Sequence, residues 1–214
     1  MWIHTHGLRR SLRVVAYEWR LQRQHLRSVR QARRYRGQTG LLLDLGSGPS
    51  HRAGWIAIDR HPAADLQLDL REEFPFDSAS ADWIYSEHFF EHLSYPKEAG
   101  RFLRECRRVL RSGGRLDLGV PDSEWPLQAY SHDGAGYFQL ARERFHPKGC
   151  DTRLHHLNFH FRQGDEHKYA YDEETLLRVL QKQGFTSVRR RDYDPALDSA
   201  HRQPGTLYLT AENP

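Results

Sequence analysis

The chain has 214 residues, which is enough for one domain with a full core and a short appendage. Its apolar fraction is 38% and its formal net charge is +4, so the surface is strongly polar and the small basic excess does not favour nucleic acid as a partner. No apolar run approaches the ~20 residues that span a bilayer, and arginines interrupt the N-terminus where a signal peptide would be apolar. We therefore expect a cytoplasmic protein without a membrane span.

Residues 1–36 predict a basic helical extension that precedes a main domain of residues 37–214. Within it, ten arginines stand against a single acid, Glu18. Apolar residues recur near helical spacing and predict one or two amphipathic helices. They are Leu8, Leu12, Val15, Trp19, Leu26 and Val29. The favoured interpretation is a helix docked across the domain with a solvated basic face; a substrate lid, a membrane-surface helix and a phosphate-binding arm are the alternatives.

Two apolar runs joined by a glycine turn come next, at residues 41–45 and 55–58. Such runs suit strands buried on both faces of a parallel sheet, whose carboxyl ends bind ligands. The glycines at 46 and 48 would let a ligand approach the backbone closely. Asp59 closes the second run, where a carboxylate can accept hydrogen bonds from the two hydroxyls of a ribose. This stretch therefore predicts a site for a nucleoside-containing cofactor.

Short strands alternate with helices along the rest of the chain. The predicted strands lie at 64–70, 83–85, 115–120, 185–191 and 206–210, and the predicted helices run from Ser94 to the Gly113–Gly114 pair and from Asp172 to Gln183. This alternation predicts an open α/β sheet, and two final strands without a helix between them predict an antiparallel hairpin at one edge.

The segment 124–169 has no clean periodicity but is rich in aromatic residues and histidines. By its position it would cover the carboxyl edge of the sheet, so we expect it to cover the substrate. The two cysteines, Cys106 and Cys150, show no spacing typical of a metal site and indicate a reducing compartment. Cys106 is expected to be a small core residue.

The ordered motifs between residues 40 and 122 resemble the class I S-adenosylmethionine-dependent methyltransferases, in particular a short subgroup with Gly-Trp-Ile-x-Ile-Asp after the glycine turn. The residues that carry the resemblance are Asp44–Gly48, Gly54–Asp59, Asp69–Leu70, Phe74–Asp82, Glu91–Leu93 and Arg108–Gly114. The resemblance implies a Rossmann-like, mostly parallel seven-stranded sheet with a C-terminal antiparallel hairpin.

The resemblance also implies that S-adenosyl-L-methionine is the cofactor, and it assigns roles to matching positions. Asp44, Gly46, Ser47 and Gly48 would face the methionine part; Asp59, followed by Arg60, would hold the ribose; Asp69 and Leu70 would contact the adenine; and Ser86, Glu87 and His88 would lie beside the transferable methyl. The chain departs from the usual pattern in one respect. Only about eight residues join the first two strands, whereas a parallel crossover normally takes a dozen or more. The helix after the glycine turn is therefore expected to be lost or reduced to a single turn.

Methyl transfer to a hydroxyl requires alignment of the acceptor and removal of its proton, a task that suits histidine near neutral pH. His156 is the first candidate base, followed by His88, His160 and His167, with His92 and His155 as further possibilities. The sequence His88-Phe-Phe-Glu91-His92 also matches the inverted zinc-protease motif. Its last two residues, Glu91 and His92, already belong to the Glu91–Leu93 motif of the methyltransferase resemblance. We therefore expect no metal, with a divalent ion on His88, Glu91 and His92 as the alternative.

The histidine-rich and aromatic segment suits an acceptor with hydroxyl groups and CH faces. We therefore expect O-methylation of a sugar or another small natural-product acceptor, by a chain that could form a homodimer. Methylation of a nucleic acid or protein is one alternative, with the basic N-terminal helix as a docking arm. A non-catalytic cofactor-binding partner protein is the other.

Overall fold

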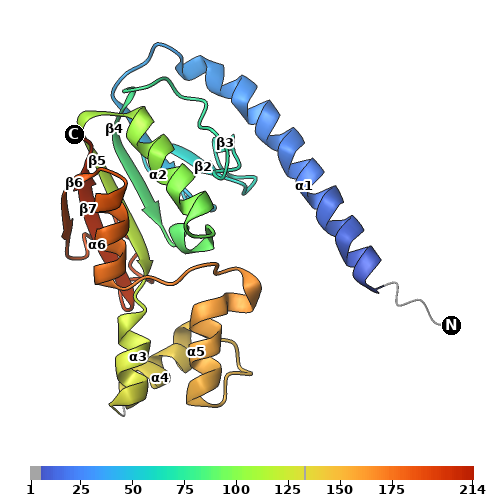
Figure 1. Ribbon diagram of the computed structural model, residues 1–214, viewed down its shortest axis with the longest axis vertical. Helices are drawn as coiled ribbons and strands as arrows, with labels where there is room; N and C mark the ends of the chain where they lie inside the picture. Colours follow the sequence, from blue (N-terminus) through green and yellow to red (C-terminus); the bar gives the residue numbers. More distant parts are fainter. Residues whose placement is uncertain (1–5, 133) are drawn as a thin grey trace.

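The structure, a computed structural model, describes residues 6–132 and 134–214 and is built on one seven-stranded sheet (Figure 1). The strands are β1 Leu41–Leu45, β2 Ile56–Asp59, β3 Leu66–Gln67, β4 Ala81–Glu87, β5 Leu110–Pro121, β6 Thr186–Arg190 and β7 Thr206–Glu212. Their order is β3-β2-β1-β4-β5-β7-β6, and β7 alone runs opposite to the other six strands. The predicted fold class, including the hairpin at one edge, is confirmed.

The core forms where the central strands meet two helices, α2 Lys97–Val109 and α6 Glu173–Lys182, which cover the same face of the sheet (Figure 1). α2 packs against β5, and α6 packs against β6 and β7. Helical spacing turns the apolar side chains of both helices toward the sheet. Phe102, Leu103 and Cys106 of α2 and Leu176 of α6 are almost fully buried, which confirms Cys106 as a core residue.

The helix α2 is shorter than predicted at both ends. It begins at Lys97, after Pro96, and ends at Val109, four residues before Gly113. β5 begins at Leu110 because this residue already pairs with Ala81 at the start of β4. The Gly113–Gly114 pair therefore lies within a strand rather than at a helix end.

The N-terminal helix α1 (His6–Gln31), followed by the 3-10 turn Ala32–Tyr35, docks only through its second half. Leu21, His25 and Ser28 are buried against the β3 edge, whereas Leu8 and Trp19 are 64% and 63% exposed. The expected docking through the stripe that includes these two residues is wrong, because the docked face lies on another side of the helix. Figure 1 shows the first half of α1 extending beyond the sheet. None of the described helices, α1 included, is both long and apolar enough to cross a membrane.

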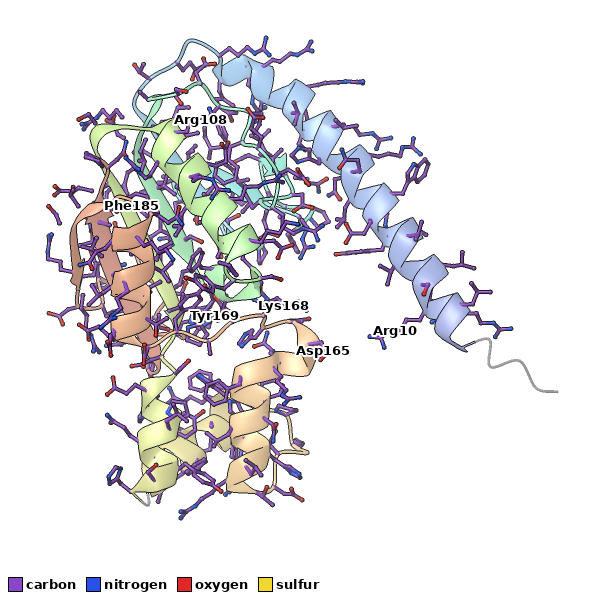
Figure 2. The ribbon with its side chains drawn as sticks, in the orientation of Figure 1. Arg10, Arg108, Asp165, Lys168, Tyr169 and Phe185 are labelled. Atoms are coloured by element: carbon purple, nitrogen blue, oxygen red, sulfur yellow. The ribbon has the colours of Figure 1, made fainter. Side chains whose placement is uncertain are left out.

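A helical cap, residues 124–165, lies beyond the carboxyl ends of the strands (Figure 1). It comprises α3 Glu124–Ser131, α4 Ala135–Leu140, a π-helical turn Ala141–Phe145, α5 Arg153–Arg162 and the 3-10 turn Gln163–Asp165. A further 3-10 turn, Phe90–His92, follows β4. Figure 2 shows Asp165, Lys168 and Tyr169 along the chain that returns from the cap to the sheet.

Candidate functional site

The glycine turn after β1 leads to β2 through residues 46–55, and none of these residues forms a helix. Of the two outcomes expected for this short crossover, the helix is lost. The backbone N–H groups of Gly46 and Ser47 both donate to the carbonyl of Ile58, at 2.7 and 3.3 Å. Gly46 has φ of 78°, and a Cβ there would lie 2.4 Å from the Cβ of Phe89. The N–H groups of Gly46 and Ser47 are therefore already used within the sheet.

A pocket of about 630 Å³ opens at the carboxyl ends of β1 to β4, within the range of small-molecule sites. The strand order reverses between β1 and β4, which is where open α/β sheets bind ligands. Six residues that the sequence assigned to the cofactor line this pocket: Gly46, Asp59, Arg60, Asp69, Leu70 and His88. Five others are not part of its lining: Asp44, Ser47, Gly48, Ser86 and Glu87.

Asp59 ends β2 at the wall of this pocket. Its Oδ1 accepts a hydrogen bond of 2.6 Å from the backbone N–H of His61, and no described residue donates to its Oδ2. The next residue, Arg60, donates to the hydroxyl of Tyr17 on α1 at 3.0 Å. The Asp59 carboxylate is thus held in place with acceptor capacity remaining, as a ribose ligand requires.

Asp69 is held by Arg71 in a bidentate pair, with Nη2 to Oδ2 at 2.6 Å and Nε to Oδ1 at 3.0 Å. Burial by itself raises the pKa of Asp69, but the hydrogen bonds and the charge of Arg71 outweigh it and the pKa is lowered. Arg71 also donates to Glu18 of α1 at 2.8 Å. Glu18 and Tyr17 line the pocket as well. Sequence reasoning missed Arg71, Glu18 and Tyr17 as pocket residues, because no local pattern connects α1 with the end of β3.

Asp44 and Glu87 are buried behind the pocket rather than in its lining. Asp44 accepts from Arg52 Nε at 2.9 Å, and its pKa is raised chiefly by burial. Glu87 accepts hydrogen bonds from the hydroxyls of Tyr208 and Ser199 at 2.9 and 2.5 Å. Both carboxylates therefore tie other segments to the strand ends, and neither is part of the pocket lining.

A second, smaller pocket of about 210 Å³ lies between the sheet and the helical cap, and His88 lines both pockets. Its other walls are aromatic and basic: Trp125, Tyr137, Phe145, His146, Phe159, His160, His167, His201 and Arg202. His88 has a left-handed backbone with φ of 55°, an uncommon conformation for a residue with a Cβ. The side chain at the junction of the two pockets is therefore set by an unusual turn at the end of β4.

The hydrogen-bond partners of His167 and His88 define which nitrogen of each ring carries the proton. His167 Nδ1 lies 2.8 Å from the carbonyl of His160, which can only accept, so Nε2 of His167 keeps its lone pair. Thr206 Oγ1 donates to the carbonyl of Arg202 and therefore accepts from His88 Nε2 at 2.8 Å. Burial lowers the pKa of both histidines, well below the ordinary value for His88. Both rings are therefore neutral near pH 7, the form that can accept a proton.

His156, the first candidate base from the sequence, lies outside both pocket linings. It is fully buried inside the helical cap, where its Nδ1 lies 2.8 Å from Nδ1 of His146. The position of His156 therefore differs from that of a base facing either pocket. His160, one turn later, does line the second pocket, and burial lowers its pKa to about 4. His155 is exposed and pairs with Asp151 at 2.6 Å.

Glu91 forms the centre of a group that could hold a metal ion. It is 2% exposed, neither of its carboxylate oxygens has a hydrogen-bond partner, and burial raises its pKa to about 8. One ligand atom each of Glu91, His92 and His167 lie within 4.8 Å of one another. His88 Nδ1 is 4.0 Å from Glu91 Oε1. The group that the structure brings together therefore has His167 in place of the His88 that was considered from sequence.

Comparisons with known proteins agree with this site. Residues 52–118 match the family model described as a methyltransferase domain. A probable S-adenosylmethionine-dependent methyltransferase of Mycobacterium tuberculosis is 35% identical over 63 residues, which cover 29% of this chain and 22% of that protein. An uncharacterized 37.1 kDa protein in a transposon of Streptomyces fradiae is 38% identical over 105 residues, covering 37% of this chain and 30% of that protein.

Among solved structures, a SAM dependent methyltransferase from Archaeoglobus fulgidus aligns with a TM-score of 0.52 at 16% identity, over 93% of this chain and 99% of that chain. At this identity the likeness shows the fold alone. The chain spans less than a third of the length of the curated relatives it matches. Sheet order, pocket position and family match together indicate one class: the chain is similar to the S-adenosylmethionine-dependent methyltransferases, and residues 52–118 match their domain.

Proposed function

We propose that this chain transfers a methyl group from S-adenosylmethionine to a hydroxyl of a small acceptor, such as a sugar or another natural product. The observation that carries the proposal is the position of His88, which lines both the pocket at the switch point and the aromatic pocket under the helical cap. A cofactor in the first pocket and an acceptor in the second would meet beside it. When bound, S-adenosylmethionine supplies an electrophilic methyl group on its sulfonium.

The residues of the first pocket suit the proposed cofactor. Asp59 Oδ2 can accept from a ribose hydroxyl, and Leu68 and Leu70 offer apolar walls for the adenine. In the second pocket, Trp125 and Phe159 can stack on the CH faces of an acceptor. His167 Nε2 accepts the hydroxyl proton in this proposal, since Nδ1 is held by the carbonyl of His160.

Cofactor binding is tested by Asp59→Asn. Removing the charge weakens the bonds from the ribose hydroxyls, so calorimetry with S-adenosylhomocysteine should give a Kd raised by about 10- to 100-fold. Asp82→Asn is the matched control, because Asp82 lies on a strand of the same sheet, pairs with Arg111 and is not part of the pocket lining. A Kd for Asp59→Asn within twofold of wild type would contradict this assignment.

Catalysis is tested with a panel of sugars and phenols in a radiolabelled methyl-transfer assay. For any acceptor that reacts, His167→Gln should lower kcat by about 10²- to 10⁴-fold, because glutamine cannot take the proton, while the cofactor Kd stays unchanged. His155→Gln should retain full activity, since His155 is exposed and lies outside both pocket linings. Activity of His167→Gln within threefold of wild type would show that His167 is not the base.

A divalent cation on Glu91, His92 and His167 is a second candidate for how the acceptor is activated. The two unpartnered oxygens of the buried Glu91 favour it. In that arrangement the cation would polarise the acceptor oxygen, and His167 would be a ligand rather than a base. Chelator treatment separates the two arrangements. Activity that the chelator removes and that added Mg²⁺ or Zn²⁺ restores supports the cation, provided that Glu91→Gln is inactive with or without added metal. Activity that resists the chelator supports the histidine base.

A further inference from the structure

The helical cap has a very small hydrophobic core of its own. Ala129, Tyr137, Phe138 and Ala141 form one buried apolar cluster in it, with Trp125 packed against them, and this cluster is separate from the core under the sheet. A unit with so little buried apolar surface usually needs a cross-link, such as a disulfide or a metal ion. Neither cysteine of the chain forms a disulfide. A metal ion bound by side chains of the cap could provide this cross-link.

Three such ligands converge between the segments of the cap. His146 follows the π-helical turn, Cys150 lies in the next loop, and His156 is on α5. One ligand atom of each lies within 4.8 Å of the others. The Nδ1 atoms of the two histidines are 2.8 Å apart, and their rings stack with centroids 5.0 Å apart. A single ion would thus connect three pieces of chain.

The surroundings of this group are those of a built site rather than of an exposed surface. His156 is 0% exposed and Cys150 is 8% exposed. The other ring nitrogen of His156, Nε2, is buried without a hydrogen-bond partner. A fully buried imidazole whose only polar contact is with another imidazole is poorly satisfied by protein groups alone.

We propose that His146, Cys150 and His156 bind a zinc ion that cross-links the helical cap. Imidazole nitrogen and cysteine thiolate are the ligands that zinc prefers, at about 2.0–2.1 and 2.3 Å. Two nitrogens on a tetrahedral zinc lie roughly 3.3 Å apart, so the histidines need to separate only slightly. When zinc binds, the ring that carries its proton on Nδ1 takes the Nε2–H tautomer instead, the thiol releases its proton to solvent, and a water molecule completes the tetrahedron.

The site also supports the acceptor pocket, because His146 lines that pocket as well. A zinc ion would hold this wall and the start of α5 in one arrangement. The proposal concerns the stability of the cap and does not depend on the proposed methyl transfer. A zinc ion also gives Cys150 a role. The sequence spacing of Cys106 and Cys150 could not indicate this role, because the other two ligands are histidines.

The direct test is the metal content of the purified, zinc-loaded and dialysed full-length protein, measured by mass spectrometry. We expect about one zinc per chain in wild type and less than about 0.2 in Cys150→Ser and in His156→Ala. His155→Ala is the matched control: it changes the neighbouring histidine of α5, which is exposed, and should retain the ion. Circular dichroism verifies that each variant is folded.

Cobalt substitution makes the test independent of variants. A cobalt-loaded wild type should show the thiolate-to-cobalt charge-transfer absorption, which a site without cysteine cannot produce. Chelation should lower the melting temperature of wild type and leave that of Cys150→Ser unchanged. Wild type that binds no zinc, or zinc that is lost in Glu91→Gln but kept in Cys150→Ser, would overturn the proposal. Because none of these readouts uses enzyme activity, failure here is distinguishable from failure of the proposed function.

Discussion

The availability of each carboxylate to a ligand depends on its neighbours in the structure rather than on its sequence motif. Asp44 and Asp59 both belong to strands of the glycine-turn region, yet Asp44 is paired with Arg52 behind the pocket and Asp59 faces its interior. Asp69 faces the pocket too, but Arg71 occupies its carboxylate. Of these three, Asp59 alone combines a pocket position with an oxygen that no described residue donates to.

Glu105 of α2 provides a pH-dependent contribution to stability. Its Oε2 accepts from Arg108 Nη2 at 2.6 Å and from the backbone N–H of Phe74 at 2.8 Å. Arg108, labelled in Figure 2, also donates to the carbonyl of Phe76, so the pair attaches α2 to the segment before β4. Burial by itself raises the pKa of Glu105, but these hydrogen bonds outweigh it and the pKa is lowered.

A depressed carboxyl pKa stabilises the fold above the unfolded pKa of 4.5, and the effect is lost as pH falls through the folded value. Glu105→Gln should therefore lower the free energy of unfolding by about 1–2 kcal/mol at pH 7, with the difference from wild type vanishing at more acidic pH. Urea titrations at several pH values measure this. Glu174→Gln is the control, because its pair with Arg178 is largely exposed and should contribute little. A difference that grows on acidification would contradict the mechanism.

At the scale of elements, α1 shows that an amphipathic pattern does not identify which face is docked. Most of the apolar stripe is exposed and only its last residue, Val29, packs against the core, while a face carrying Leu21, His25 and Ser28 lies on the β3 edge. His25 Nδ1 accepts from the N–H of Asp69, and Ser28 Oγ accepts from the N–H of Gln67. Polar side chains of the helix thus accept the hydrogen bonds of backbone N–H groups at and just after the two-residue strand β3. Hydrophobic periodicity contains no signal for such contacts.

Deleting residues 1–16 should leave the fold and the cofactor affinity intact. The described side chains in this range are exposed, and the deletion keeps Tyr17 and Glu18, which line the pocket. The melting temperature should stay within about 2 °C of wild type. Leu21→Ala, in contrast, should lower the free energy of unfolding by about 2–3 kcal/mol, because Leu21 is buried at the docked face. Equal losses in the two variants would show that the exposed half also docks.

At the scale of the whole molecule, a buried ionic network attaches the C-terminal segment to the central sheet. Arg191, after β6, donates to Asp117 on β5 at 2.9 Å and to Asp198 at 2.6 Å. Asp198 also accepts from the hydroxyl of Tyr85 on β4. The side chains of both aspartates are fully buried. The segment that follows then reaches Glu87 through Ser199, so the network helps to shape the strand ends beside the site.

Arg191→Met should be strongly destabilising, by about 3–5 kcal/mol, because it leaves the buried Asp198 without its cation and Asp117 with Arg115 alone. Chemical denaturation followed by circular dichroism measures the loss. Arg189→Met is the matched control: Arg189 is on the same strand but is exposed, so its replacement should change stability by less than about 0.5 kcal/mol. Similar losses in the two variants would argue against the network.

The sequence by itself determined the class of fold. Glycine turns, buried apolar runs and strand-end acids are local patterns, and six of the residues that they singled out line one pocket: Gly46, Asp59, Arg60, Asp69, Leu70 and His88. Tertiary structure alone decided which acids are paired, which face of α1 docks, and which histidines meet. His156, Cys150 and His146 became neighbours because α5 folds back on the preceding loop. Such contacts depend on the packing of segments distant in sequence, whereas periodicity and motif spacing report only on the local chain.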